Sequence, residues 1–252
     1  MIKRKTYSFR GGDILDIEEY HDGRYGAPGL KRMKRRKATK EDMLRVNKWN
    51  KEKRCRQRLL QYFKETDLFL TWTYSIEERP PDMQTALKDF RRSIAKVRRA
   101  YRKRGYELFW IRNIEQGTKG AWHIHLIVNE IGDSASIVQK TWDHGGTWIT
   151  EIKRSKFYDE DFMKLACYMT KDKNTTEQKK DGTEGKPRIK ESSYNTSKNT
   201  PLSDPHEDKL RRWKKEVKPK KGYYIARVWE GINPKTGYKY RRCTMIRLNR
   251  RI

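Results

Sequence analysis

Residues 106–129 read YELFWIRNIEQGTKGAWHIHLIVN, two strongly apolar segments separated by the turn-like QGTKG. Segments rich in aromatic and β-branched residues on either side of a glycine-containing turn predict a β-hairpin. We expect this hairpin to lie at the centre of the hydrophobic core.

The elements on either side of the hairpin predict the fold. Before it, DLFLTWTYS at 67–75 reads as a strand, and 84–104 reads as an amphipathic helix with apolar residues three or four positions apart. After it, SASIVQKTW predicts a short helix opened by Asp133 or Ser134, and GTWITEIKR predicts a further strand. This order of strand, helix, strand, strand, helix, strand is the ferredoxin-like circuit, an α+β fold in which helices cover one face of an antiparallel sheet.

The composition of the flanking segments predicts four regions. Residues 1–38 contain the basic cluster KRMKRRK and no sustained apolar period, which indicates a flexible basic arm. A core over 39–172 begins with a basic helix capped by Thr39 and ends with a helix in YDEDFMKLACYMTKD. Residues 173–221 are polar and indicate a flexible loop or linker, whereas 222–252 predict a basic β-hairpin packed on the core.

The charge balance predicts a polyanionic partner. The chain has 61 Lys and Arg against 33 Asp and Glu, a formal net charge of +28. No apolar run approaches the roughly 18 residues of a membrane span, and the start of the chain lacks the apolar stretch of a signal peptide, so nucleic acid in the cytoplasm is favoured over a membrane. The candidate nucleic-acid contacts are Lys31, Arg32, Lys34, Arg35, Arg36, Lys37, Arg241 and Arg242.

Two histidines in the second strand of the hairpin are the first candidates for chemistry. Side chains alternate between the faces of a strand, so His123 and His125 share a face, about 7 Å apart. Trp122, Ile124 and Leu126 would then lie on the other face, under the helices. The pattern fits a metal-binding pair, and it equally fits two exposed strand histidines.

A third metal ligand should come from the neighbouring strand, where Glu115 is the candidate. With a two- or four-residue loop Glu115 would pair opposite Trp122 and face away from the histidines. An odd-length loop, or a glycine bulge at Gly117 or Gly120, would bring it opposite His123, and we predict this register. Two imidazoles and a carboxylate suit Mg²⁺ or Mn²⁺.

Tyr168 in the sequence YMTK is a further candidate for the site. On a helix Tyr168 and Lys171 share a face, and Tyr168 lies at the edge of the apolar stripe, so its hydroxyl could leave the core and point toward the sheet. The alternative is an amphipathic tyrosine at a packing boundary.

Taken together, FLTWTYS, HIH with Glu115 upstream, and YMTK resemble in order and spacing the three motifs of HUH-superfamily single-strand endonucleases. Within that superfamily the chain looks like the rolling-circle replication initiators of phages, plasmids and integrative elements of Gram-positive bacteria. The basic helix before the first strand and the later YNTSKNTP are similar too, although that family more often has Ser-Arg where Ser197 and Lys198 stand. The resemblance covers roughly residues 40–205.

The resemblance implies a DNA-nicking enzyme of the bacterial cytoplasm. Tyr168 would be the nucleophile that attacks a phosphodiester of single-stranded or hairpin origin DNA, releasing a 3′-hydroxyl and forming a 5′-phosphotyrosine. The cation would lie at His123, His125 and Glu115, and Lys171 would help to hold the phosphate or lower the pKa of the tyrosine. No GxxxxGK[ST] motif is present, so a separate helicase is implied. The alternatives are a relaxase or single-strand transposase of the same superfamily, and an RNA-binding module with the same order of elements.

Overall fold

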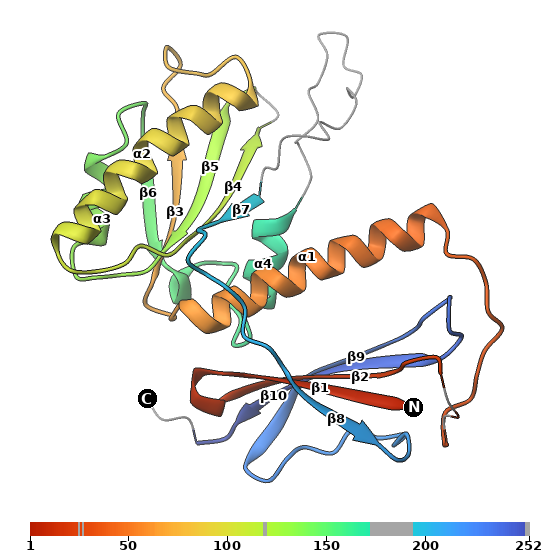
Figure 1. The fold of residues 1–252 in the computed structure, drawn as a ribbon. Coiled ribbons are helices and arrows are strands. Elements are labelled where there is room, and N and C mark those ends of the chain that lie inside the picture. Colours follow the sequence, from red (N-terminus) through yellow and green to blue (C-terminus); the bar gives the residue numbers. More distant parts are fainter. Residues whose placement is uncertain (25, 27, 118–119, 172–193, 250–252) are drawn as a thin grey trace. The chain divides into compact units, whose positions relative to one another are not determined.

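The computed structural model describes residues 1–24, 26, 28–117, 120–171 and 194–249 of the chain (Figure 1). These divide into two compact units, which we call the central unit, Lys51–Pro201, and the terminal unit, Met1–Asn50 with Leu202–Ile252. Each unit contains one five-stranded antiparallel sheet. The protein is therefore an α+β protein, as the sequence predicts.

The central unit has the predicted ferredoxin-like circuit. Its sheet has the order β6-β3-β5-β4-β7, so the strands of the predicted hairpin lie inside the sheet. The elements are β3 (Leu68–Thr73), α2 (Met83–Lys103), β4 (Trp110–Gln116), β5 (Trp122–Val128), α3 (Ser134–Lys140), β6 (Thr147–Glu151), α4 (Met163–Thr170) and β7 (Tyr194–Thr196). A short 3-10 helix, Ile152–Arg154, follows β6.

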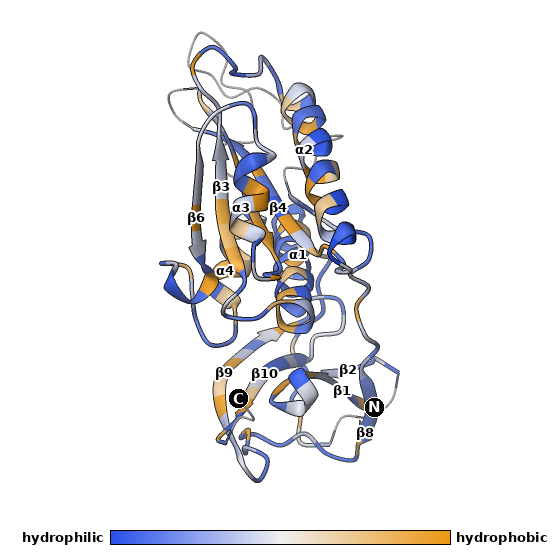
Figure 2. Ribbon diagram, turned by 90° about the vertical axis from the view of Figure 1, so that its left-hand side faces the viewer, coloured by the Kyte–Doolittle hydropathy of each residue, from blue (hydrophilic) through white to orange (hydrophobic). Residues whose placement is uncertain are grey.

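Helix α2 covers one face of this sheet because its apolar residues recur at helical spacing. Asp82 caps the helix by accepting a hydrogen bond from the Thr85 amide at 2.8 Å. The buried side of α2 packs with Trp122, Ile124 and Leu126 of β5 in one hydrophobic cluster. Figure 2 shows apolar residues along strands β3 and β4 of the same sheet. The prediction that these three β5 residues lie under the helices is confirmed, which leaves the opposite face of β5 for the histidines.

Helix α1 (Lys40–Tyr62) begins where the sequence predicts. The Asp42 amide donates to Thr39 Oγ1 at 3.1 Å, and the Thr39 amide donates to Asp42 Oδ2 at 3.0 Å. These two reciprocal bonds satisfy amides that the helix itself leaves unpaired.

The terminal unit corrects the prediction that 1–38 is a flexible arm. Its sheet has the order β8-β1-β2-β10-β9, and its first hairpin is formed by residues near the amino terminus. The strands are β1 (Ile2–Phe9), β2 (Ile14–His21), β8 (His206–Leu210), β9 (Tyr223–Ile232) and β10 (Lys239–Arg247). In the sequence the charged residues of β1 look like those of a solvated segment, so the strand is not recognised. In the structure these charges are balanced by residues across the sheet, as in the 2.6 Å ion pair between Arg4 and Glu19.

The basic cluster at 31–37 is exposed, and it too is held in place. The Met33 amide donates to the Gly237 carbonyl at 2.7 Å, and the Arg36 amide donates to the Pro234 carbonyl at 3.1 Å, so the cluster lies along the turn between β9 and β10. This segment is attached to the sheet by backbone hydrogen bonds.

The carboxyl-terminal region agrees in part with the prediction. Strands β9 and β10 form the hairpin predicted within residues 222–252, but β10 pairs with β2 of the terminal unit, whereas the prediction packed this hairpin on the core. The predicted linker 173–221 contains two strands, since β7 pairs with β4 and β8 pairs with β1. Both are short polar edge strands that lack the apolar alternation by which strands are recognised. The part of the predicted linker at 173–193 lies outside the described residues.

Among the helices that the structure describes, none has the length and apolar composition that crossing a membrane requires.

Candidate active site

The register of the β4–β5 hairpin brings the predicted carboxylate to the predicted histidines. Glu115 pairs directly opposite His123, as predicted. The Gly117 amide donates to the Ala121 carbonyl at 2.7 Å, so an odd number of residues, three, joins these two positions. Gly120, the last of the three, has a φ of +74°, which glycine adopts without strain.

His125 contacts residues of β3, β4 and α4 on this face of the sheet. Its Nε2 lies 2.6 Å from Glu115 Oε1, its Nδ1 lies 2.9 Å from Thr71 Oγ1, and the residue is only 8% exposed. An ionised carboxylate can only accept, so we assign the ring proton to Nε2 and let Nδ1 accept from the Thr71 hydroxyl. This arrangement fixes both the tautomer and the ring orientation.

Glu115 joins this histidine to Lys171. The Lys171 ammonium lies 2.7 Å from Glu115 Oε2, on the carboxylate oxygen that His125 does not contact. Burial alone would raise the pKa of Glu115, but the hydrogen bonds from His125 and Lys171 outweigh it and lower the pKa to about 2. Glu115 is therefore ionised at neutral pH.

Tyr168 reaches the same cluster from α4. Its hydroxyl oxygen lies 3.0 Å from His125 Nε2, and its ring stacks on Phe157 with the ring centroids 3.7 Å apart. The Lys171 ammonium lies 4.1 Å from the centre of the tyrosine ring, within the range of a cation–π contact. Burial, together with the negative charge of Glu115, raises the pKa of Tyr168 above its ordinary value. The prediction that Tyr168 points from its helix toward the sheet is confirmed.

The proximity of Lys171 to Tyr168 has a different origin from the one predicted. Helix α4 ends at Thr170, and Lys171 is its C-cap residue with an extended ψ of 138°. The helix also begins later than predicted, because Phe162 has a left-handed φ of 57°. The chain therefore leaves the helix at Lys171 and turns this side chain back over Tyr168 toward Glu115.

His123 completes the group of predicted site residues. Its ring centroid lies 6.4 Å from that of His125, and burial lowers its pKa. His123 forms no hydrogen bond with any described residue, and its lowered pKa favours the neutral imidazole that a metal requires.

The donor set suits a divalent cation, but the side chains do not converge on one point. Among the residues that the structure describes, no group of three or more His, Cys, Asp or Glu side chains is placed to hold a metal ion. Glu115 and His125 already contact each other at 2.6 Å, and the cationic group beside Glu115 is Lys171. Joint coordination by Glu115, His123 and His125 requires a side-chain rotation, so the metal site stays a prediction.

The basic residues predicted to contact nucleic acid fall into two groups. The cluster Lys31, Arg32, Lys34, Arg35, Arg36 and Lys37 is exposed, whereas Arg241 is buried, with its side chain 4% exposed. Arg241 pairs with Glu19 and lies over the ring of Trp213, and Arg242 pairs with Glu18 at 2.9 Å. Arg241 is thus a structural residue of the terminal sheet, which corrects the prediction for it.

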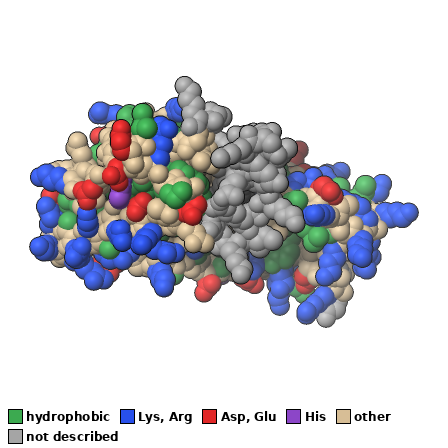
Figure 3. All heavy atoms as spheres, turned by 90° about the horizontal axis from the view of Figure 1, so that it is seen from above, with side chains coloured by type: hydrophobic (Ala, Val, Ile, Leu, Met, Phe, Trp, Pro, Cys, Tyr) green, Lys and Arg blue, Asp and Glu red, His purple; other side chains and the backbone are tan. Residues whose placement is uncertain are grey.

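Positive charge is not confined to those predicted residues. On the face shown in Figure 3, Lys and Arg side chains are distributed widely, with acidic side chains among them. A surface of this kind attracts nucleic acid without selecting a sequence.

Three further residues of the site were not predicted. Thr71 contacts His125, and Phe157 stacks on Tyr168. The side-chain amide of Asn113 donates to the Lys171 carbonyl at 3.2 Å. Alternation in the strand at 67–75 could have identified Thr71, which pairs opposite His125. No local pattern identifies Phe157, because it lies in a loop before α4.

Comparison with known proteins places this site inside a recognised segment. Residues 67–173 match the model of the replication-associated protein ORF2 family, and this segment runs from β3 through α4. Searches of curated proteins and of solved structures each give no match. The matched segment contains Glu115, His123, His125, Tyr168 and Lys171, and it supports a protein of the replication-initiator type with a role in DNA replication.

Proposed function

We propose that this protein is a single-strand DNA endonuclease that initiates rolling-circle replication through a covalent bond to Tyr168. The observation that carries the proposal is the position of the Tyr168 hydroxyl, 3.0 Å from His125 Nε2, in a cluster with Glu115 and Lys171. A tyrosine that served only packing would not need an imidazole beside its hydroxyl, an ammonium over its ring and a carboxylate that contacts both of these groups.

In the proposed reaction the Tyr168 oxygen attacks a backbone phosphorus and gives its proton to solvent water, which also supplies the proton that the leaving oxygen takes up. The bond from phosphorus to the 3′ oxygen breaks, and that oxygen takes up a proton to leave as a 3′-hydroxyl. The 5′ phosphate stays on Tyr168, and attack by a 3′-hydroxyl reverses the step, so the same site can join strands.

The surrounding residues would position and stabilise the reacting groups. Phe157 and Lys171 hold the tyrosine ring from different sides, and Thr71 orients the imidazole of His125. The Lys171 ammonium, beside the ring, offsets negative charge that develops on the phenolic oxygen or the phosphate.

Glu115, His123 and His125 are the residues that would hold a divalent cation, Mg²⁺ or Mn²⁺. When bound, such a cation would polarise the scissile phosphate and offset its charge. The expected partners are single-stranded or hairpin origin DNA and a separate helicase, in the cytoplasm of a bacterial host.

The proposal is tested by trapping the covalent intermediate. Purified full-length protein is mixed with Mn²⁺ and single-stranded DNA that carries its replication origin, and the products are separated under denaturing conditions. The wild type should give a protein–DNA adduct, and Tyr168→Phe should give none. Tyr106→Phe, which removes an exposed tyrosine hydroxyl of the same unit, is the matched control and should retain the adduct.

Substitution of the histidines separates chemistry from binding. His123→Ala and His125→Ala should abolish nicking and leave salt-sensitive DNA binding largely intact, because backbone binding comes from the Lys and Arg surface. An adduct formed by Tyr168→Phe would show that another residue is the nucleophile.

A further inference from the structure

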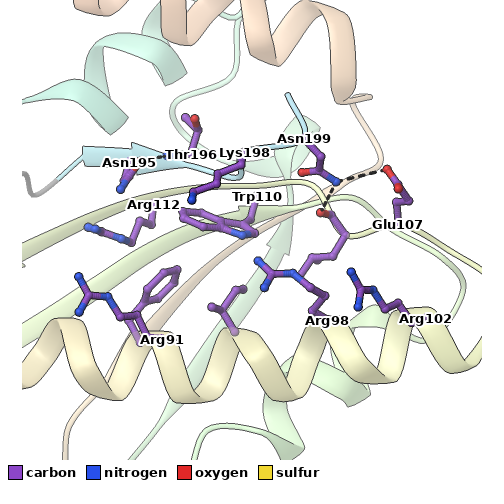
Figure 4. A pocket seen from close by; sticks show the side chains of 13 residues that line it. Arg91, Arg98, Arg102, Glu107, Trp110, Arg112, Asn195, Thr196, Lys198 and Asn199 are labelled. Carbon is purple, nitrogen blue, oxygen red and sulfur yellow. Dashed lines mark hydrogen bonds between the residues drawn. The ribbon is translucent and has the colours of Figure 1, made fainter. Parts of the chain in front are cut away.

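The central unit contains a second basic site, on the side of the sheet that α2 covers. A cavity of about 750 Å³ lies between α2, strand β4 and the segment 195–199 (Figure 4). Its basic residues are Arg91, Arg98 and Arg102 of α2, Arg112 of β4, and Lys198. None of these was predicted to bind nucleic acid.

The arginines of α2 form a stripe directed at the cavity. Positions 91, 98 and 102 lie on one side of the helix, since they are seven and four residues apart. Among the described residues Arg91, Arg98 and Arg102 form no ion pair, whereas Lys96 of the same helix and Arg104, its C-cap residue, pair with aspartates. The charge of this stripe is therefore available to a ligand.

Among the described residues that line the cavity, one carries a carboxylate. Glu107 lines the cavity, and its Oε2 accepts a hydrogen bond from the Asn199 side-chain amide at 3.3 Å (Figure 4). The same amide group also lies 3.3 Å from the Leu108 carbonyl. One carboxylate against five basic side chains leaves a strong excess of positive charge.

Arg112 shows that this charge is held in a partly apolar environment. The residue is only 4% exposed, and its guanidinium lies 5.0 Å from the centre of the Phe90 ring. Burial, with the nearby charge of Arg91, lowers the pKa of Arg112 to about 10. An anion near Arg91 and Arg112 would offset both the repulsion between them and the cost of burying Arg112.

The remaining lining combines apolar and amide groups. Phe90, Ile94, Leu108 and Trp110 form an apolar part of the wall, and Asn195 and Asn199 contribute amides. Arginines that surround an apolar wall suit a nucleic-acid strand, in which charged phosphates alternate with sugars and bases. A free inorganic anion would use the arginines alone.

The cavity lies on the opposite side of the sheet from the nucleophile. Arg112 and Asn113 are neighbours on β4 and so point to opposite faces, and Asn113 bonds the Lys171 carbonyl beside Tyr168. Phosphates bound in the cavity are therefore not the scissile phosphate.

We propose that this cavity binds the phosphodiester backbone of single-stranded DNA away from the cleavage position. The inference rests on the proposed function in one respect, that the polyanion is DNA. Phosphate contacts of this kind fix the position of a strand without reading its sequence, and in an initiator they would hold the DNA that flanks the nick.

The test compares two double variants of α2 that remove the same charge. Arg91→Gln with Arg98→Gln removes two cavity arginines, and Arg92→Gln with Arg99→Gln removes two exposed arginines outside the cavity. Both are made in the Tyr168→Phe background, so binding is measured without cleavage. Affinity for a fluorescent single-stranded oligonucleotide of mixed sequence is followed by anisotropy over a range of salt concentrations.

The cavity variant should bind about tenfold more weakly than the parent protein. The slope of its log affinity against log salt concentration should be smaller in magnitude by about 1.4, which is about 0.7 for each of the two lost phosphate contacts. The control pair should change affinity by less than about threefold, as expected for diffuse surface charge. Equal losses in the two variants would overturn the proposal, because the cavity would then be an ordinary part of a basic surface.

A second arm distinguishes DNA from a free anion. Inorganic pyrophosphate is titrated against both variants by calorimetry. If the cavity variant loses pyrophosphate binding but keeps its DNA affinity, the cavity is a small-anion site and the proposal fails. Because neither arm measures nicking, failure of this inference and failure of the proposed endonuclease activity are separate outcomes.

Discussion

Neutralising Glu115 should destabilise the central unit by an amount that depends on pH. The variant Glu115→Gln keeps the shape of the side chain and removes the charge that His125 and Lys171 share. A fall in pKa from the ordinary 4.5 to about 2 corresponds to about 3 kcal/mol, at about 1.4 kcal/mol for each tenfold change in proton affinity. The Lys171 side chain is 29% exposed, so solvent screens part of this, and we expect a loss of about 2 kcal/mol at pH 7.

The sign of the pH dependence follows from the direction of that change. The folded protein binds the Glu115 proton more weakly than the unfolded chain, so the stabilisation is fully present above pH 4.5 and is lost as the pH falls toward 2. At pH 3 the difference between wild type and Glu115→Gln should be less than half of its value at pH 7.

Hydrogen exchange of peptides from β5 provides the assay, because the two units of the chain can open separately. Opening free energies are measured at pH 7 and pH 3 and corrected for the intrinsic exchange rate at each pH. Glu77→Gln removes an exposed carboxylate of the same unit and serves as the control, with an expected change within about 0.5 kcal/mol. A loss in Glu115→Gln that is the same at both pH values would refute the reasoning, since it would come from packing and not from charge.

Three further substitutions test individual contacts. Thr71→Val should cost about 1 kcal/mol of stability and reduce nicking about tenfold, because it removes the donor to His125 Nδ1, whereas Thr71→Ser should retain most nicking in a denaturing-gel assay. Lys171→Met should reduce nicking by about 10²-fold with little change in DNA affinity, since it removes the cation beside Tyr168; equal losses of both would contradict this. Arg241→Gln should lower the melting temperature and leave the DNA affinity of the folded protein unchanged, because its side chain is buried in an ion pair; a selective loss of DNA binding would restore it as a contact residue.

The parts of the fold that depend on local patterns were predictable from the sequence. Helix α2 shows its apolar stripe and its cap, and the β4–β5 hairpin shows two apolar segments around a glycine-containing turn. The length of that turn alone left the register of Glu115 open; the register was predicted because a carboxylate was expected opposite His123, and the structure has it there. In each case the residues that determine the structure are close together in the chain.

The terminal sheet could not be predicted in the same way. Strand β2 pairs with β10 through contacts such as Ile17 with Cys243, positions that lie at opposite ends of the chain. The charged residues of β1 and β2 read as solvated, whereas in the structure Arg4 and Arg241 both pair with Glu19. A basic residue that binds nucleic acid and one that pairs across a sheet look alike in sequence, because the partner is supplied only by folding.

Glu115 also links the stability of the site to the ionisation of Tyr168, the proposed nucleophile. Burial raises the pKa of Tyr168 and the charge of Glu115 raises it further, so both disfavour the tyrosinate. The Lys171 ammonium contacts Glu115 and the Tyr168 ring at once, and a scissile phosphate would compete with Glu115 for it. Glu115→Gln should therefore lower the pKa of Tyr168 and at the same time impair nicking. This combination would show that Glu115 acts on nicking through the positions of His125 and Lys171, and not by making Tyr168 easier to ionise. If NMR of labelled tyrosine showed no such decrease, the negative charge beside Tyr168 would not control its ionisation, and the role of Glu115 would be limited to holding His125 and Lys171 in place.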